Sequence, residues 1–253
     1  MTGGCEPLAG RRALVTGGGN GIGAAVAARF AALGAAGMIV DLASCLPASP
    51  PAGWGAVAAD VRDEQAVAAA VHAASEALGG LDAVVAAAGV VPSWQPPAGL
   101  DLDDFERVLA INVLGVAATI KHATPFLGAD STITVVASLN SWRGDPNIIS
   151  YVASKHAALG IVRSAALALG PSGVRVNAVA PGPVATSALR SRMAARRDQT
   201  GLSPEEAITQ AGHATALARI ATVGEVVDVI TFLTSSASSG MTGQLLNVDC
   251  GIL

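Results

Sequence analysis

Tyr151 and Lys155 stand four positions apart in the segment SYVASKHAAL, and Tyr151 is the only tyrosine of the chain. On a helix, side chains at this spacing share one face and can meet. A positive charge beside a tyrosine favours the phenolate and lowers its pKa from the ordinary value of about 10. The pair could therefore exchange a proton with a bound molecule near neutral pH. Because a packed tyrosine beside a solvated lysine gives the same short pattern, the rest of the sequence must decide between the two interpretations.

A cluster of glycines marks a second site of chemistry, near the start of the chain. Gly17, Gly21 and Gly23 follow the apolar run RALVT and open an alanine-rich helical stretch. At such a strand-to-helix turn, glycine lets the backbone approach a ligand, and the free N–H groups of the helix attract a pyrophosphate. A flexible loop is the alternative, and the absence of a following GK[ST] excludes a P-loop. The context predicts a dinucleotide cradle.

Asp41 closes the next apolar run, GMIVD, and bears on which dinucleotide would bind. A carboxylate at this place accepts hydrogen bonds from the adenosine ribose and repels a 2′-phosphate. The glycine loop itself reads Gly18, Gly19, Asn20, without a basic residue. Both observations favour NAD(H) over NADP(H). The alternative, a helix-capping aspartate, is weaker because the prolines of residues 43–54 forbid a regular helix there.

With TGGGNGIG near one end and YVASK past the middle, the sequence resembles the classical short-chain dehydrogenase/reductase family over nearly its whole length. Ser138, thirteen residues before Tyr151, and Asn112 in VLAINVLG match the family's other two catalytic positions. The resemblance implies that Ser138 binds the substrate oxygen and that Tyr151 transfers the proton. It also implies that Lys155 lowers the tyrosine pKa and contacts the nicotinamide ribose, and that Asn112 holds a water molecule.

The resemblance also implies where cofactor and substrate bind. Asn140 joins Ser138 and Tyr151 as a substrate residue. From its place after Ser138, the neighbouring 141–143 segment is expected at the substrate entrance, and Trp94 is expected either there or as a packed anchor of its loop. Three positions depart from the family pattern: Ala86 and Ala87 make AAAG of the usual NNAG at residues 86–89, and Cys250 stands where glycine is usual. The expected cofactor residues are Thr16, Gly17, Gly19, Asn20, Gly21, Ile22, Gly23, Asp41, Leu42, Asp60, Val61, Ala87, Ala88, Gly89, Tyr151, Lys155, Pro181, Gly182, Val184 and Thr186.

Short apolar runs alternate with longer alanine-rich stretches along the chain, which is typical of repeated βαβ units. We expect an α/β fold: one Rossmann-type doubly wound domain over residues 1–253, with a seven-stranded parallel sheet and helices on both faces. A polar insertion at about 186–222 interrupts the alternation and has the length of a functional lid. The expected strands are 12–16, 37–41, 55–60, 83–89, 132–138, 174–181 and 244–249, and the expected helices 21–33, 63–78, 102–121, 151–169 and 225–233.

Composition excludes several classes of function. A net charge of −4 does not provide the excess of positive charge that nucleic-acid binding uses. The apolar runs are shorter than the roughly 18 residues of a spanning helix, and no apolar signal core precedes the first strand, so we expect no membrane association and a cytoplasmic location. The three cysteines and four histidines lack ligand spacing, which predicts neither a disulfide framework nor a metal site.

The sequence therefore predicts an NAD-dependent oxidoreductase that interconverts a secondary alcohol and its ketone, a small molecule, in a homotetramer or homodimer. A 3-oxoacyl-thioester reductase is one alternative, and a catalytically silent NAD-binding regulator is another. Four arginines in the insertion could meet the phosphates of a coenzyme A thioester, but a solvated basic helix face is the favoured interpretation. These are Arg190, Arg192, Arg196 and Arg197.

Overall fold

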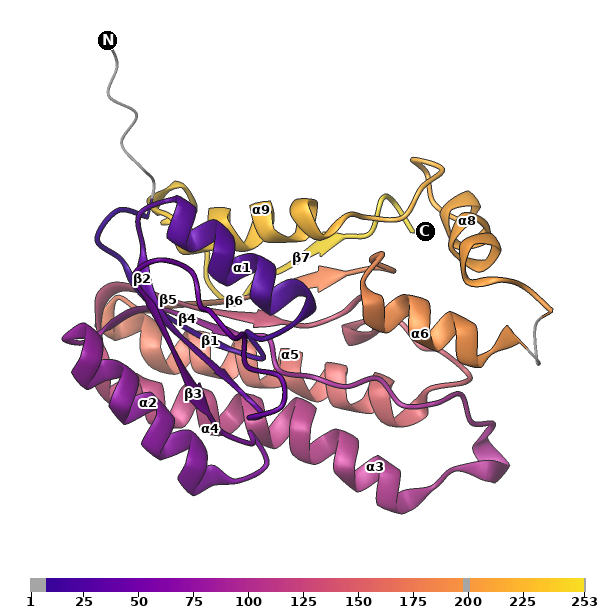
Figure 1. The fold of residues 1–253 in the computed structure, drawn as a ribbon, viewed down its shortest axis with the longest axis horizontal. Coiled ribbons are helices and arrows are strands. Elements are labelled where there is room, and N and C mark those ends of the chain that lie inside the picture. The colour runs from indigo at the N-terminus through magenta and orange to yellow at the C-terminus, as the bar shows by residue number, and fades with distance from the viewer. Residues whose placement is uncertain (1–7, 198–200, 253) are drawn as a thin grey trace, which may run out of the picture.

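Seven short apolar segments pair into one parallel sheet in the computed structural model, which describes residues 8–197 and 201–252 (Figure 1). The strand order is β3-β2-β1-β4-β5-β6-β7, so the chain moves outward in one direction from β1 and later in the other from β4. This confirms the expected fold class. The strands are β1 Arg12–Thr16, β2 Ala36–Asp41, β3 Trp54–Ala58, β4 Leu81–Ala86, β5 Leu127–Val136, β6 Arg175–Pro181 and β7 Leu245–Val248.

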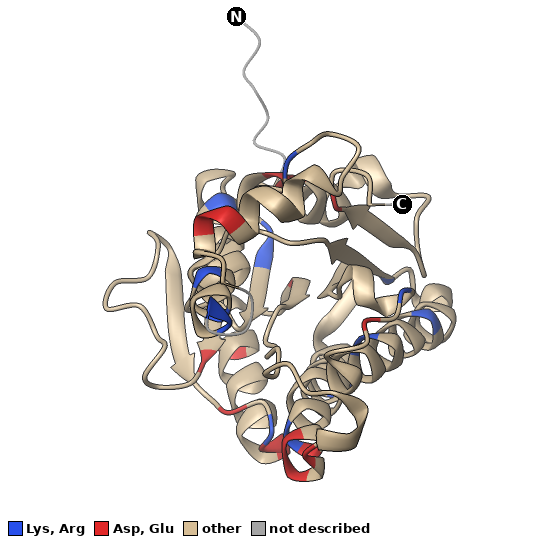
Figure 2. Ribbon diagram, turned by 90° about the vertical axis from the view of Figure 1, so that its right-hand side faces the viewer, with Lys and Arg blue, Asp and Glu red and all other residues tan. Residues whose placement is uncertain are grey.

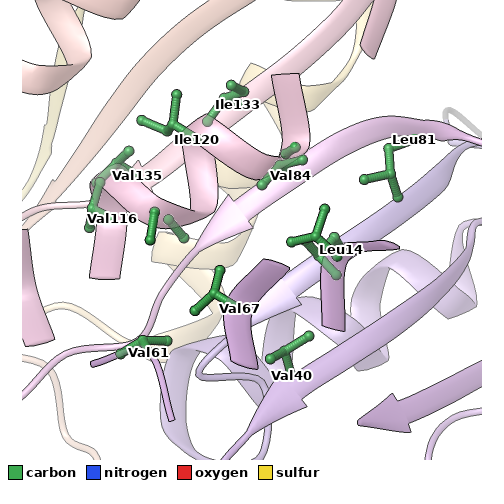
Figure 3. Packing of buried hydrophobic residues seen from close by; sticks show 14 of the residues in the cluster. Leu14, Val40, Val61, Val67, Leu81, Val84, Val116, Ile120, Ile133 and Val135 are labelled. Atoms are coloured by element: carbon green, nitrogen blue, oxygen red, sulfur yellow. The ribbon is translucent and has the colours of Figure 1, made fainter. Parts of the chain in front are cut away.

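Helices cover both faces of this sheet, which is why its strands are apolar on both sides (Figure 1). On β1, Leu14 packs in the core shared with α2, α4 and α5, while its neighbour Val15 packs in the core shared with α1 and α9. Figure 3 shows the first of these cores, with Leu14, Val67 and Ile120 among its members. The helices are α1 Gly21–Ala32, α2 Glu64–Leu78, α4 Gly115–Ala123, α5 Ile149–Leu169 and α9 Val223–Thr234.

The helix expected at 102–121 is divided into three parts. α3 (Leu102–Leu109) runs into one wide π-helical turn, η2 (Ala110–Leu114), and α4 continues to Ala123. The stretch Leu102–Phe126 is long and apolar enough to cross a membrane by length and composition, but the core helix of a soluble protein passes the same weak test. α4 buries Val116 and Ile120 against the sheet, as a core helix does.

Among its described residues, 186–197 and 201–222, the insertion at 186–222 contains two helices, for which the sequence analysis gave no bounds. α6 (Ser187–Ala195) begins after Thr186, whose hydroxyl accepts a hydrogen bond from the Leu189 N–H at 3.2 Å. α8 (Pro204–His213) begins with a capping box, in which Ser203 and Glu206 satisfy each other's backbone N–H groups. Thr222 and Glu225 start α9 in the same way, two residues earlier than expected.

All strands of a parallel sheet present their carboxyl ends at one edge, which lies on the right of Figure 1. The loops that follow β1, β2, β4, β5 and β6 meet there, together with α6 and the N-terminal part of α5. Figure 2 views the molecule from this side and shows acidic and basic residues interspersed around it. The edge is where ligands bind in open α/β sheets.

Replacing Leu14 by alanine should destabilise the protein by about 2–5 kcal/mol, because it opens a cavity in a packed core. Leu14 has an exposed fraction of 0%, whereas Leu217 in the loop after α8 is 61% exposed. Leu217→Ala is the matched control and should change the free energy of unfolding by less than about 0.5 kcal/mol. Urea denaturation of both variants at one protein concentration measures the difference. Equal effects would contradict the assignment of Leu14 to the core.

Candidate active site

A cleft of about 590 Å³ lies at the carboxyl edge of the sheet. Its walls come from the turn between β1 and α1, from the ends of β2, β4, β5 and β6, and from α5 and α6. The volume is within the range typical of small-molecule and cofactor sites. Residues distant in sequence, from Gly17 to Arg192, therefore face one space.

The glycine turn forms one end of this cleft. Gly17 has φ +68°, and a Cβ built there would lie 2.5 Å from the backbone nitrogen of Ala88. A Cβ on Gly23 would lie 2.2 Å from the carbonyl oxygen of Gly17. Asn20, which caps α1, makes no side-chain capping bond within the described chain, so the first N–H groups of the helix point at the cleft without that partner. Only glycine permits this tight turn, and its shape suits an anionic group.

Asp41 stands beside the glycine turn at the end of β2. Its Oδ2 accepts a hydrogen bond from the Gly19 N–H at 2.9 Å, and its Oδ1 accepts one from the Leu42 N–H at 2.8 Å. These bonds fix the carboxylate on the cleft wall. Farther along the same wall, Arg62 binds Asp60 at 2.6 Å, and this pairing lowers the pKa of the Asp60 carboxyl.

Tyr151, Ser138 and Lys155 meet at the other end of the cleft. The helical spacing brings the Lys155 Nζ to 5.6 Å from the centre of the Tyr151 ring, and the Ser138 side chain lies close enough to the Tyr151 hydroxyl to act on its pKa. Lys155 is only 5% exposed, and its ammonium donates to the Val136 carbonyl at 2.9 Å. A carbonyl at the end of β5 thus holds the lysine beneath the tyrosine.

Burial controls the titration of this group. Burial raises the pKa of Tyr151, while the Ser138 hydrogen bond and the charge of Arg192 act in the opposite direction. Burial also lowers the pKa of Lys155 to about 8. The expected lowering of the tyrosine pKa by Lys155 is not seen in this structure, since the ammonium is bonded to Val136 and desolvation dominates.

Asn112 lies behind these residues, fully buried in the π-helical turn η2. Its side-chain oxygen accepts from the Val90 N–H at 2.9 Å, and its Nδ2 donates to the Val90 carbonyl at 2.9 Å and to Ser154 Oγ at 3.0 Å. One amide thereby ties the strand-end loop after β4 to α5. A water molecule bound by Asn112, as the resemblance implies, would have to use the hydrogen-bonding positions of the amide that Val90 and Ser154 leave open.

Most of the predicted site residues line the cleft, including Tyr151, Lys155, Ser138 and Asp41. Thr16 and Gly19 lie behind the wall, in β1 and the glycine turn, and do not line it. Asn140, predicted to contact substrate, is buried outside the cleft in η4 (Leu139–Ser141), where its amide donates to the Arg143 carbonyl at 3.4 Å. Its contacts close a turn and do not face the site.

Comparison with known proteins identifies the family of this chain. Residues 17–253 match the family model described as Enoyl-(Acyl carrier protein) reductase. The cis-4-hydroxycyclohexanecarboxylate dehydrogenase of Sinomonas cyclohexanicum is 38% identical, over 97% of this chain and 98% of its own. Short-chain dehydrogenase reductase 5 of Arabidopsis thaliana is also 38% identical, over 97% of this chain and 95% of its own. The chain belongs to the short-chain dehydrogenase/reductase family.

A solved member of this family has the same fold throughout. The aldohexose dehydrogenase of Thermoplasma acidophilum in its ligand-free form superposes with a TM-score of 0.88 at 28% identity, covering 98% of this chain and 96% of that one. Short-chain dehydrogenases/reductases use a nicotinamide cofactor, NAD or NADP. The glycine turn, where no Cβ would fit at Gly17 or Gly23, and the uncapped start of α1 suit the pyrophosphate of such a cofactor.

Several cleft residues are not found by sequence reasoning. Arg62 follows the Asp60–Val61 pair directly, which is a signal that could have placed it on the wall.

Arg192 carries no such signal, and its position depends on how α6 packs. The expected solvated basic face is correct for Arg190 and Arg197 and wrong for Arg192 and Arg196, which are half-buried. Other lining residues absent from the prediction include Cys45, Val90, Arg107 and Ile111.

Lys155→Met should stabilise the cofactor-free protein at pH 7 by about 1–3 kcal/mol, because a buried ammonium disfavours folding. The folded pKa of about 8 lies below the ordinary 10.5. Between these values the unfolded chain binds a proton that the folded chain has released, so wild-type stability rises with pH across this window. The advantage of the variant should therefore shrink from pH 8 to pH 10.5.

Urea denaturation at several pH values measures this effect. The other lysine, Lys121, is the matched control, since its ammonium is bound to Glu64 at 2.6 Å on the surface and its side chain is 67% exposed. Lys121→Met should show no pH-dependent gain. A Lys155→Met protein that is less stable than wild type at pH 7 would contradict the burial argument.

Proposed function

We propose that the protein is an NAD-dependent oxidoreductase that interconverts a secondary alcohol and its ketone. The observation that carries the proposal is that Ser138, Tyr151 and Lys155 line the same cleft as the glycine turn. A relative at 38% identity is named as a dehydrogenase of a cyclohexane that bears a hydroxyl and a carboxylate. Another, at 34%, is named as an isopiperitenol and carveol dehydrogenase of Mentha piperita.

The residues at the tyrosine end can perform the proton half of this reaction. The nicotinamide cofactor supplies hydride acceptance or donation when bound. Ser138 is placed to hydrogen-bond the substrate oxygen, and Tyr151 to take its proton as the alcohol is oxidised, or return it as the ketone is reduced. Lys155 lies 5.6 Å from the tyrosine ring, where its proposed role is to contact the nicotinamide ribose of the bound cofactor. Asn112 positions the loop and the helix that carry these groups.

The preference for NAD rests on Asp41. Its carboxylate is fixed on the cleft wall by two backbone N–H groups, at the place where the adenosine ribose of a dinucleotide would bind. A 2′-phosphate at the same place would meet this negative charge. The nearby cation, Arg62, is already paired with Asp60. The wall therefore favours a ribose hydroxyl over a phosphate.

The description of the family model, an enoyl-(acyl carrier protein) reductase, favours a second candidate, reduction of an acyl chain that is carried as a thioester. The silent-regulator alternative is disfavoured, because the Ser138–Tyr151–Lys155 group is assembled at the cleft. The cytoplasmic location, the assembly as a homotetramer or homodimer, the lack of nucleic-acid or membrane partners and the single-domain interpretation of residues 1–253 stay predictions.

Tyr151→Phe should lower the turnover of alcohols with NAD by at least about 100-fold, since it removes the group that transfers the proton. The phenyl ring keeps its packing, so the affinity for NADH should stay unchanged. Absorbance assays over a panel of secondary alcohols give the rate, and calorimetry gives the affinity. Undiminished turnover would exclude Tyr151 as the acid/base, and a wild-type protein that binds NAD but oxidises no alcohol would move the regulator interpretation forward.

Asp41→Ala should weaken NAD binding by about ten- to a hundredfold, because hydrogen bonds to a charged group are lost. Binding of NADP should become stronger as the repulsion disappears. Calorimetric titration of each protein with both cofactors measures the ratio. Asp103→Ala is the control, since Asp103 is an exposed residue of α3 away from the cleft. A wild-type preference for NADP would overturn the argument.

A further inference from the structure

Helix α6 lines the cleft with Ser187, Ala188 and Arg192, and the arginines on it and at its C-terminal end have different surroundings. Arg190 binds Glu205 of α8 at 2.9 Å on the outer surface. The guanidinium of Arg196 lies 3.7 Å from the centre of the Trp94 ring, which connects α6 to the loop after β4. Arg192 instead turns inward and lines the cleft together with Tyr151 and Ser138. The helix is fixed from both sides by its neighbours, and Arg192 is left facing the site.

Arg192 is a half-buried cation without an acidic partner in residues 8–197 and 201–252. Its Nε donates a long hydrogen bond to the Ala188 carbonyl at 3.4 Å, within its own helix. It is close enough to Tyr151 for its charge to lower the pKa of the tyrosine. A guanidinium removed from water in this way is costly unless an anion compensates it.

The cleft offers no such anion from the described part of the protein. The acidic residues on its wall are Asp41 and Asp60, at the end of β2 and after β3, and both are already hydrogen-bonded there. The site for a pyrophosphate is the turn between β1 and α1, whereas Arg192 stands with the tyrosine and serine hydroxyls. The missing negative charge therefore belongs to whatever binds beside Tyr151.

We propose that Arg192 binds a carboxylate on the substrate, so that the substrate class is a hydroxy acid and its oxo acid. The guanidinium fork matches the two oxygens of a carboxylate. Binding there would place the rest of the molecule between α6 and the Ser138–Tyr151 pair, with its hydroxyl or carbonyl group at these two residues. This inference rests on the proposed function, because it assumes that the cleft holds a cofactor and a substrate together.

The test compares cyclohexanecarboxylate with cyclohexanecarboxamide, a neutral probe of similar shape, as ligands of the protein loaded with NADH. Fluorescence of the bound NADH reports their binding without requiring turnover. The carboxylate should bind the wild-type complex about 30-fold more tightly than the amide, as expected for a buried charge pair. Arg192→Gln should remove this difference, and Arg192→Lys should retain part of it. Arg190→Gln, on the outer side of the same helix, should leave it unchanged.

The outcomes separate this inference from the proposed function. If the protein binds no NADH, the proposed function fails together with the inference. If it binds NADH but not the carboxylate, or binds both probes equally, the inference is overturned and the oxidoreductase proposal stands. Tighter binding of cyclohexyl phosphate than of the carboxylate would overturn the assignment of a carboxylic acid. Equal loss of both probes in Arg192→Gln would show a structural role in place of charge recognition.

Discussion

Parallel pairing of the strands is the constraint on which the rest of the structure depends. Parallel strands share one carboxyl edge, and the order β3-β2-β1-β4-β5-β6-β7 opens a crevice there, where the chain reverses its direction across the sheet. The glycine turn, Asp41 and Ser138 each follow a different strand, yet all reach the same crevice. A polar side chain at this edge lies outside the two apolar cores, so it can contact a ligand without disturbing the packing of the core.

The polar groups at that edge are held by backbone atoms to a large degree. Asp41 accepts hydrogen bonds from two backbone N–H groups, and Lys155 donates one to the Val136 carbonyl. Asn112 hydrogen-bonds both the N–H and the carbonyl of Val90. Such contacts orient side chains without a partner of opposite charge that would neutralise them. The lysine consequently stays charged but desolvated, which lowers its pKa and costs stability. The fold tolerates this cost where the site needs a cation.

How much could be predicted from sequence depended on whether the signal was local. Apolar runs located all seven strands, and the i, i+4 spacing correctly brought Tyr151 to Lys155. The capping box at Ser203 and Glu206 was a local signal for α8 that could have been read. The inward direction of Arg192 and the closed turn around Asn140 depend on how elements pack, and no neighbouring residue reports that.

The π-helical turn between α3 and α4 has a consequence for how this helix can change. A π turn holds one residue more than an α turn, so it takes up an extra residue without changing which faces the two flanking segments present. Deleting one residue of Ala110–Leu114 would restore a continuous α-helix and leave α3 and α4 facing the same neighbours. The change would fall on the turn itself, from which the Asn112 amide reaches Val90 and Ser154. A deletion in this turn should therefore disturb the position of Asn112 more than the packing of α4.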